Sequence, residues 1–205
     1  AAAVTGAGRF IVVEGGEGVG KSTQVERLAG SLRARGREVV VTYEPGDTNA
    51  GAELRNALLH SDALDPRAEL LLMLADRAQH VAEVIRPAIA RGAIVVCDRY
   101  APSTLAYQGV ARGLGVDAVE RLSGWAAGEL EADAVIVLDL PDAIAERRVS
   151  PHRDRFERAG AEFHARVRAA YRELAAARGW LLVDADGTPD EVAVRVLGAV
   201  SSVVP

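Results

Sequence analysis

The sequence predicts an α/β fold in which a central parallel five-stranded sheet is flanked by helices. Two observations predict it: short apolar runs alternate with segments of helical periodicity, and the first apolar run ends in a glycine-rich turn. Parallel strands need crossover connections, so a strand–helix–strand order implies right-handed crossovers and a parallel sheet. A length of 205 residues with 49% hydrophobic residues suits one such domain with a full core.

The five expected strands are fully or nearly apolar, as is typical of strands buried on both faces. They cover residues 10–13, 39–43, 93–97, 134–138 and 180–183. The expected helices have apolar residues three and four positions apart, and glycines at 36 and 92 stop two of them. These helices cover residues 21–35, 51–59, 66–91, 116–128, 141–148, 157–178 and 189–200.

A phosphate-binding loop follows the first strand. The stretch from Gly15 to Ser22 matches G-x-x-x-x-G-K-[ST] between an expected strand and an expected helix, which is the context that this motif requires. Glycines let backbone N–H groups approach phosphate oxygens, Lys21 would reach the β- and γ-phosphates, and the Ser22 hydroxyl would ligate Mg²⁺. A flexible connector with a chance match is the alternative, but it explains neither flanking element. The loop predicts a P-loop NTPase fold.

Composition supports a special role for Lys21. Of the 24 basic residues, Lys21 is the only lysine and the other 23 are arginines. A compact ammonium on a flexible stem suits a phosphate cradle. A coding bias towards arginine would explain the low lysine count but not the position of the one lysine.

Charge and cysteine content exclude several classes of function. A net charge of −5 argues against a non-specific nucleic-acid or membrane-surface binder. The single cysteine, Cys97, excludes an internal disulfide and fits a reducing compartment, and its apolar surroundings indicate a core position. Residues 1–8 lack the features of a secretory signal and no run is long enough to span a bilayer, so we expect a disordered extension and a cytoplasmic protein. The four histidines show no metal-ligand spacing.

Further polar segments follow the ends of the expected strands. Asp98 comes directly after the strand at 93–97, where a carboxylate helps to hold the metal ion of a nucleotide site. Residues 101–115 are polar and glycine-rich and predict a substrate-contacting segment, with a solvated turn as the alternative. Residues 148–156 are rich in arginine and contain Pro151; we favour a lid that closes over the transferred phosphate rather than an exposed connector.

These motifs, in this order, resemble the thymidylate kinase family over nearly all of residues 9–200. The motifs that carry the resemblance are Glu14 to Thr23, Glu44-Pro45-Gly46, Arg55, Asp76-Arg77-Ala78-Gln79-His80, Asp98-Arg99-Tyr100, Ser103, Ala106-Tyr107-Gln108-Gly109, Arg112-Gly113 and Asp154-Arg155-Phe156-Glu157. The resemblance implies transfer of the γ-phosphoryl group of ATP to dTMP, giving dTDP, with Mg²⁺ and as a step in dTTP biosynthesis. It also implies a homodimer that packs long helices together, with 66–91 as a candidate face.

The resemblance assigns roles to individual residues. Arg55 and Arg99 would bind the acceptor phosphate and Arg77 the thymine edge. Tyr107 would lie against C2′ of the sugar, Gln108 near the base, and Glu17 near the sugar 3′-hydroxyl or the metal. The Glu44–Pro45 bond would be cis and would shape the acceptor pocket. The residues expected to bind dTMP are Glu44, Pro45, Arg55, Met73, Arg77, Arg99, Ser103, Tyr107 and Gln108. Those expected to bind ATP are Gly15, Gly16, Glu17, Gly18, Val19, Gly20, Lys21, Ser22, Thr23 and Arg147, with Ser22 and Asp98 at the metal.

Catalysis would use Lys21, Arg99, Glu17 and an arginine of the lid. Because Glu17 places an acid at the third position of the loop, the catalytic arginine is expected at Arg148 or Arg153, and we favour Arg153. Three residues depart from the pattern of many relatives: Tyr43 replaces an arginine, Asp47 a glycine, and Met73 the phenylalanine that stacks on thymine.

Two other functions are compatible with parts of the sequence. The chain could phosphorylate a different nucleoside monophosphate or a deoxynucleoside. It could also be a nucleotide-dependent switch without turnover, although such a switch has no use for the acceptor arginines Arg55, Arg77 and Arg99.

Overall fold

The computed structural model describes residues 7–148 and 155–204, with Glu157 described in its backbone only. Its five strands form one sheet in the order β2-β3-β1-β4-β5, and every neighbouring pair is parallel. The strands are β1 (Arg9–Gly15), β2 (Val39–Tyr43), β3 (Ile94–Asp98), β4 (Ala134–Asp139) and β5 (Leu181–Asp184). The predicted parallel five-stranded sheet is confirmed.

Helices connect the strands as right-handed crossovers require. They are α1 (Lys21–Ala34), α2 (Asn49–His60), α3 (Pro66–His80), α4 (Arg86–Ala90), α5 (Ala101–Thr104), α6 (Val116–Ala127), α7 (Asp142–Arg148), α8 (Ala161–Arg178) and α9 (Pro189–Ala199). Two π-helical segments continue α3 and α5, at Val81–Ile85 and Leu105–Ala111. Among the described residues, none of these helices is both long and apolar enough to cross a membrane.

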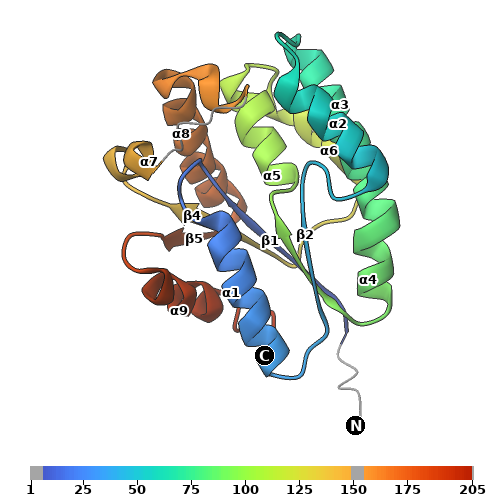
Figure 1. Cartoon of the computed structure of the whole chain (residues 1–205), viewed down its shortest axis with the longest axis vertical. Helices are drawn as coiled ribbons and strands as arrows, with labels where there is room; N and C mark the ends of the chain where they lie inside the picture. Colours follow the sequence, from blue (N-terminus) through green and yellow to red (C-terminus); the bar gives the residue numbers. More distant parts are fainter. Residues whose placement is uncertain (1–6, 149–154, 205) are drawn as a thin grey trace.

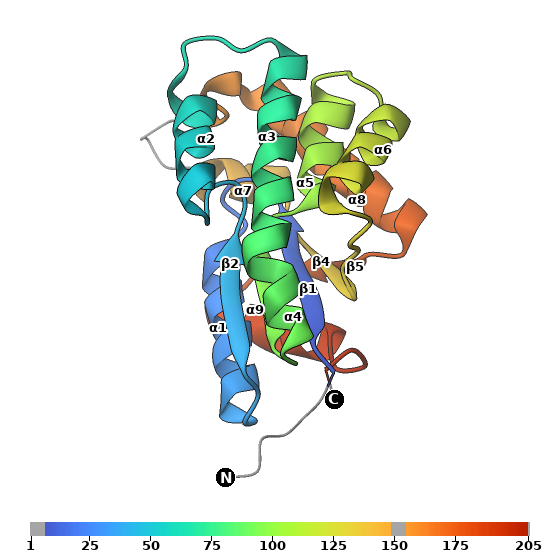
Figure 2. The same ribbon diagram turned by 90° about the vertical axis from the view of Figure 1, so that its right-hand side faces the viewer.

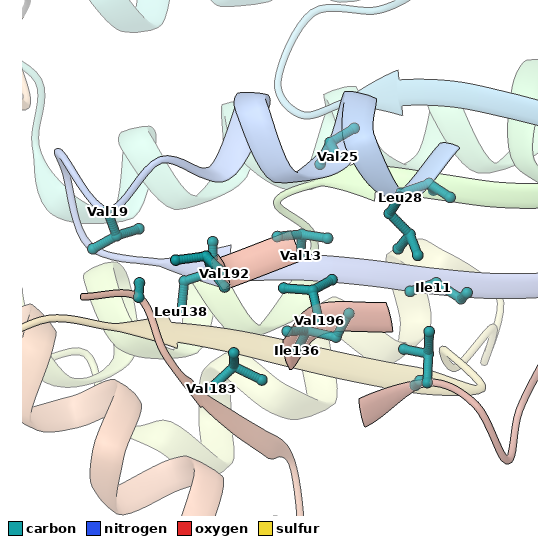
Figure 3. Packing of buried hydrophobic residues seen from close by; sticks show 14 of the residues in the cluster. Ile11, Val13, Val19, Val25, Leu28, Ile136, Leu138, Val183, Val192 and Val196 are labelled. Atoms are coloured by element: carbon teal, nitrogen blue, oxygen red, sulfur yellow. The ribbon is translucent and has the colours of Figure 1, made fainter. Parts of the chain in front are cut away.

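Successive residues of the central strands pack into different cores. Ile11 and Val13 of β1 contact the core under α1 and α9, which lie side by side across one face of the sheet (Figures 1 and 3). Phe10 and Val12 point to the opposite face, where the π-helical segment Val81–Ile85 and α4 cover them. This alternation buries both faces of β1 and explains why its sequence is continuously apolar.

A second layer of helices stands beyond the carboxyl ends of the strands. Figure 2 shows α2, α3, α5, α6 and α8 gathered there, above the turn in which β1 ends. The core of this layer centres on Tyr107, whose ring makes edge-to-face contacts with Phe156, Phe163 and Tyr171 at centroid distances of 6.1, 6.0 and 6.4 Å. Strand ends and this layer together enclose the space in which ligands of open α/β sheets bind.

Two expectations need correction. The solvated turn considered for 101–115 is wrong: most of this segment is helical, and Thr104, Tyr107 and Gln108 are buried. Packing against α8 and α6 overrides its glycine and polar content. The helix expected from residue 157 begins only at Ala161, after a short 3₁₀ turn, because Gly160 has φ +92° and breaks the helix.

A buried carboxylate joins β1 to the helical layer. Glu14 is completely buried, and its Oε1 accepts from the Tyr100 and Ser103 backbone N–H groups at 2.8 and 3.2 Å. Its Oε2 accepts from the Ser103 hydroxyl at 2.6 Å and the Tyr171 hydroxyl at 2.8 Å. Burial raises the pKa of Glu14, and these four donors offset part of that cost. Glu14 thereby fixes α5 and α8 relative to the turn after β1.

The substitution Tyr171→Phe tests this connection. It removes one donor to a buried carboxylate, so we expect the free energy of unfolding to fall by about 1–3 kcal/mol. The control is Tyr43→Phe, the same change at a residue that is 42% exposed, where the effect should stay within about 0.5 kcal/mol. Equal effects of the two substitutions in denaturant titrations would contradict the role assigned to Tyr171.

Candidate functional site

The loop between β1 and α1 can be built only with glycine at several positions. Gly15, Gly18 and Gly20 have φ values of +137°, +75° and +89°. A Cβ at Gly15 would lie 2.5 Å from the Leu138 carbonyl oxygen, and one at Gly18 would lie 2.9 Å from the Ala145 carbonyl oxygen. The loop therefore passes close to the end of β4 and to α7, and its glycines are required by contact as well as by conformation.

Lys21 is buried beneath this loop. Its Nζ donates to the carbonyl oxygens of Gly16 at 2.7 Å and Gly15 at 3.2 Å. Burial, followed by repulsion from Arg99, lowers the pKa of Lys21 to about 8. Among the described residues its hydrogen bonds go to neutral carbonyl groups, so the site holds a desolvated cation that a bound anion would stabilise.

Two oxygen ligands stand at the start of α1 and the end of β3. The Ser22 hydroxyl donates to Asp98 Oδ2 at 2.8 Å, so the two residues expected at the metal lie side by side. The described residues contain no cluster of three or more His, Cys, Asp or Glu that could enclose a metal ion alone. A hydroxyl and a carboxylate suit Mg²⁺, which keeps several waters and takes its other ligands from substrate phosphates.

Two cavities meet at this site. The larger, of about 570 Å³, contains Lys21, Ser22 and Asp98 in its wall, and the smaller, of about 260 Å³, lies under α3 and the segment after α5. The residues common to both walls are Glu17, Glu44, Arg55 and Arg99. Two arginines thus stand where the cavities join.

The predicted residues distribute between the two cavities. All nine residues expected at the acceptor line the smaller cavity: Glu44, Pro45, Arg55, Met73, Arg77, Arg99, Ser103, Tyr107 and Gln108. Of the residues expected at the donor, the larger cavity is lined by Glu17, Gly18, Gly20, Lys21, Ser22 and Thr23. Gly15, Gly16 and Val19 are buried within the loop, and Arg147 is exposed on the last turn of α7.

Arg99 and Glu17 form an ion pair at the junction. Arg99 Nη2 lies 2.5 Å from Glu17 Oε1, and the Tyr107 hydroxyl donates to the same oxygen at 3.1 Å. Burial opposes ionisation of Glu17, but the charges of Arg99 and Lys21 outweigh it and lower the pKa of Glu17 to about 2. Arg99 has φ +70°, a left-handed conformation that is uncommon for a residue with a side chain. The guanidinium group is therefore held by the backbone and by Glu17 together.

Arg77 is fixed by partners on three sides. Its Nε and Nη2 lie 3.0 and 2.9 Å from Glu44 Oε2, Nη2 donates to Thr104 at 2.9 Å, and Nη1 donates to Ser123 at 3.3 Å. The guanidinium also lies over the Tyr100 ring, 4.9 Å from its centroid. Within the described part of the chain, one Nη1 hydrogen has no partner. Arg77 can therefore offer a single directed hydrogen bond to a ligand.

The turn after β2 explains two of the departures from the pattern of relatives. Its Glu44–Pro45 bond is cis, as the resemblance implies. The Asp47 carboxylate accepts from the hydroxyl of Thr42, which lines the larger cavity, and Asp47 itself lines neither cavity. Tyr43 packs under Arg55, whose guanidinium lies 5.7 Å from the ring centroid and donates to the Pro45 carbonyl oxygen at 2.6 Å.

Glu69 connects the base of the smaller cavity to the C-terminal end of the expected lid. This buried carboxylate accepts from Gln108 at 2.7 Å, from Arg112 at 3.2 and 3.3 Å, and from Arg155 at 2.6 Å. Arg155 also donates to the Leu58 carbonyl oxygen at 2.9 Å, and Phe156 lines the cavity. The C-terminal side of the expected lid is thus anchored to α2 and α3.

Arg148 and Arg153 are the two candidates for a lid arginine. Arg148 ends α7, and its Cβ lies 3.2 Å from the position of a Cβ at Gly18, so it is adjacent to the phosphate loop. Arg153 lies outside the described residues. Arg168 of α8 holds the start of α7 through Asp142 at 2.8 Å.

Sequence reasoning assigned no role to four residues that build the site. They are Glu14, Glu69, Thr104 and Ser123. The two glutamates carried a usable signal, because each adjoins apolar residues on the buried face of its element and a buried carboxylate needs nearby donors. Thr104 was predicted only as part of the substrate-contacting segment 101–115, and Ser123 carried no signal, since its partner Arg77 comes from a distant helix.

Comparison with known proteins gives one consistent result. Residues 13–196 match the model of a family described as Thymidylate kinase. A thymidylate kinase of Synechococcus sp. (strain JA-2-3B'a(2-13)) is 47% identical over 198 residues, which cover 96% of each chain. One of Leifsonia xyli subsp. xyli (strain CTCB07) is 50% identical over 194 residues, covering 92% of each chain. One of Solidesulfovibrio magneticus (strain ATCC 700980 / DSM 13731 / RS-1) is 48% identical over 208 residues, covering 95% of this chain and 100% of that protein.

The lowered pKa of Lys21 predicts a measurable dependence of stability on pH. The folded protein loses the Lys21 proton near pH 8, whereas the unfolded chain keeps it until about pH 10.5. Charged Lys21 therefore destabilises the fold below pH 8, and this cost disappears as pH rises from 8 to 10.5. Relative to Lys21→Met, the wild type should gain about 1–3 kcal/mol of unfolding free energy over this range.

The matched control is Lys21→Arg, which stays charged and should show no gain over that pH range. Denaturant titrations at fixed ionic strength measure the difference. A wild-type curve parallel to that of Lys21→Met would rule out a lowered pKa at Lys21.

Proposed function

The chain belongs to the thymidylate kinase family, and we propose that the site described above performs the reaction of that family, transfer of the γ-phosphoryl group of ATP to dTMP to give dTDP and ADP. The chain is therefore a dTMP kinase. The roles of the site residues are assigned from one observation: the two cavities meet at Arg55 and Arg99. One cavity contains the phosphate loop and the other the acceptor residues, so two phosphate groups can approach each other in line at the junction.

On the donor side, the loop amides and Lys21 bind the phosphates of ATP. The cation of Lys21 is already desolvated, so the polyphosphate replaces neutral carbonyl partners by a charged one. Ser22 and Asp98 would hold Mg²⁺, which supplies charge neutralisation on the phosphates when it is bound. As the reaction proceeds, Lys21 remains within reach of the negative charge on the transferred group.

On the acceptor side, Arg55 and Arg99 bind the phosphate of dTMP. Their planar guanidinium groups suit a phosphate better than a point charge does. Glu17 keeps Arg99 in place and remains ionised near neutral pH, since its pKa is about 2. In this position its carboxylate can also accept a hydrogen bond from the sugar hydroxyl, as the resemblance implies.

The base and sugar of dTMP occupy the smaller cavity. Arg77 gives its remaining Nη1 hydrogen to the thymine edge, while Met73 supplies a thioether contact with the ring face. Tyr107 lies in the cavity wall with its hydroxyl bound to Glu17, which fixes its ring against the sugar. Gln108 is oriented by Glu69 and lies near the base.

The transferring phosphoryl group needs a further cation, which we assign to an arginine of the segment 148–156. Arg148 is beside Gly18, and Arg153, which the sequence favours, is the other candidate. In related phosphoryl transfers such an arginine contributes about 10³–10⁵ in rate. The anchor formed by Arg155 and Glu69 would let this segment stay attached over the acceptor while it supplies the guanidinium group.

We also propose a cytoplasmic homodimer. Three large apolar side chains are exposed on α3 and α6, two helices that pack against each other: Leu71 (61% exposed), Leu122 (43%) and Trp125 (79%). Exposed apolar surface of this kind marks protein interfaces. Residues of α3 line the smaller cavity, and Ser123 of α6 accepts a hydrogen bond from Arg77. Pairing of two copies at these helices would therefore stiffen the acceptor site.

The acceptor specificity tests the proposed reaction. Purified protein with ATP and Mg²⁺ should convert dTMP to dTDP much faster than it phosphorylates dUMP, dCMP, AMP or thymidine. Lys21→Met should lower the rate by about 10²–10³ while its circular dichroism spectrum stays that of the wild type. Phosphorylation of thymidine without turnover of dTMP would reject the assignment.

The homodimer has its own test. The substitution Trp125→Glu places a charge on the proposed interface, so the species seen in sedimentation should change from dimer to monomer. Val194→Glu is the control, because Val194 is similarly exposed (73%) but lies on α9, far along the chain from the proposed face. A monomeric wild type, or an unchanged dimer with Glu at position 125, would exclude this interface.

A further inference from the structure

A series of polar groups, most of them buried, lies behind Arg77, and its histidine has no role assigned so far. It consists of Glu44, His80, Thr42 and Asp47, which come from β2, from the turn after it and from the end of α3. His80 is completely buried, Thr42 is 1% exposed and Glu44 is 6% exposed. Because isolated buried polar groups are costly, a connected series of this length needs an explanation.

The distances define one continuous chain of hydrogen bonds. Glu44 uses Oε2 for Arg77 and Oε1 for His80, whose Nδ1 lies 2.9 Å away. The other ring nitrogen of His80, Nε2, lies 2.5 Å from the Thr42 Oγ1. Thr42 in turn donates to the Asp47 carboxylate. The imidazole therefore joins the carboxylate that holds Arg77 to a second carboxylate in the turn.

With Glu44 and Asp47 ionised, counting hydrogens gives one arrangement of the imidazole that satisfies every contact. A threonine hydroxyl has one hydrogen, and here it goes to Asp47, so Thr42 can only accept from His80 Nε2. An ionised carboxylate has no hydrogen, so His80 Nδ1 must donate to Glu44. Both ring nitrogens therefore carry a proton, and the ring is a cation.

The charges around the ring agree with this count. Glu44 and Asp47 are at the two ends of its hydrogen bonds, and Asp76 and Arg77 lie on its own helix. Burial, followed by repulsion from Glu44, raises the pKa of Asp76 to about 6, so Asp76 is mostly ionised at pH 7. Cys97 of the adjacent strand stays a neutral thiol, since burial raises its pKa. The cluster thus holds three carboxylates and one guanidinium group, and a cationic imidazole lowers its net charge from −2 to −1.

We propose that His80 is a positioning residue for recognition of the acceptor base: held as an imidazolium by Thr42 and Asp47, it fixes the Glu44 carboxylate that orients Arg77. This inference rests on the proposed contact of Arg77 with thymine. It also assigns a role to Asp47, because this carboxylate accepts the Thr42 hydroxyl hydrogen and keeps it directed away from the ring. Without Asp47 the hydroxyl can donate to Nε2, and the ring then becomes neutral.

The protonation state can be measured without any substrate. In protein labelled with ¹⁵N-histidine, two-bond ¹H–¹⁵N spectra distinguish protonated from unprotonated ring nitrogens, and His80→Asn identifies the His80 signal by its loss. At pH 7 both nitrogens of His80 should be protonated in the wild type, and Nε2 should be unprotonated in Asp47→Ala. An unprotonated nitrogen in the wild type, or no change in Asp47→Ala, would overturn the assignment.

Kinetics of two amide variants test the positioning role. The side-chain amide of His80→Asn can donate near the position of Nδ1, towards Glu44, whereas that of His80→Gln donates near Nε2, towards Thr42. Loss of the bond to Glu44 should raise the KM for dTMP about tenfold in His80→Gln, with the KM for ATP within about twofold of the wild type. His80→Asn should stay within about threefold for both substrates.

A general loss of structure would look different. Both variants would then lose thermal stability and change both KM values together, and that outcome would refute a positioning role. His60→Gln, a change at an exposed histidine at the end of α2, controls for the substitution itself. If the wild type fails to phosphorylate dTMP, the proposed function falls and the base-directed role with it, whereas the ring signals decide the charge of His80 independently.

Discussion

A carboxylate removed from water must receive hydrogen bonds, and this constraint shapes the acceptor half of the molecule. Three glutamates, Glu14, Glu44 and Glu69, are buried there, and each collects donors from elements distant in the sequence. Glu14 holds α5 and α8, Glu44 holds Arg77 and His80, and Glu69 holds Gln108 and Arg155. The walls of the smaller cavity are therefore set before any ligand enters, which reduces the ordering cost of binding.

In the donor half, the buried charged group is a cation and its partners are neutral. Lys21 is buried against neutral carbonyl groups, and Arg99 forms an ion pair with Glu17. The wall of the larger cavity combines three basic side chains, of Lys21, Arg55 and Arg99, with four carboxylates, of Glu17, Glu26, Glu44 and Asp98. Glu17 lies where the two cavities meet, and there it pairs with Arg99.

Much of this could be predicted from the sequence, for reasons that differ from element to element. The buried strands and the phosphate loop follow from local pattern, since continuous apolar runs and closely spaced glycines have few other uses. The acceptor arginines were reached only through the resemblance, because Arg55, Arg77 and Arg99 are far apart along the chain. The helical state of 101–115 was missed because tertiary packing overrides its composition. The direction of Asp47 depends on a hydroxyl across the turn, and no local pattern encodes it.

One compositional detail has a practical consequence. Because Lys21 is the only lysine side chain and its pKa is about 8, it is partly unprotonated under mildly alkaline conditions and nucleophilic there. An amine-directed acylating reagent that carries a phosphate group would therefore label one side chain, at the bottom of the donor cavity. In the purified protein, protection of Lys21 from such labelling would report nucleotide occupancy without a mutation or a fluorescent tag.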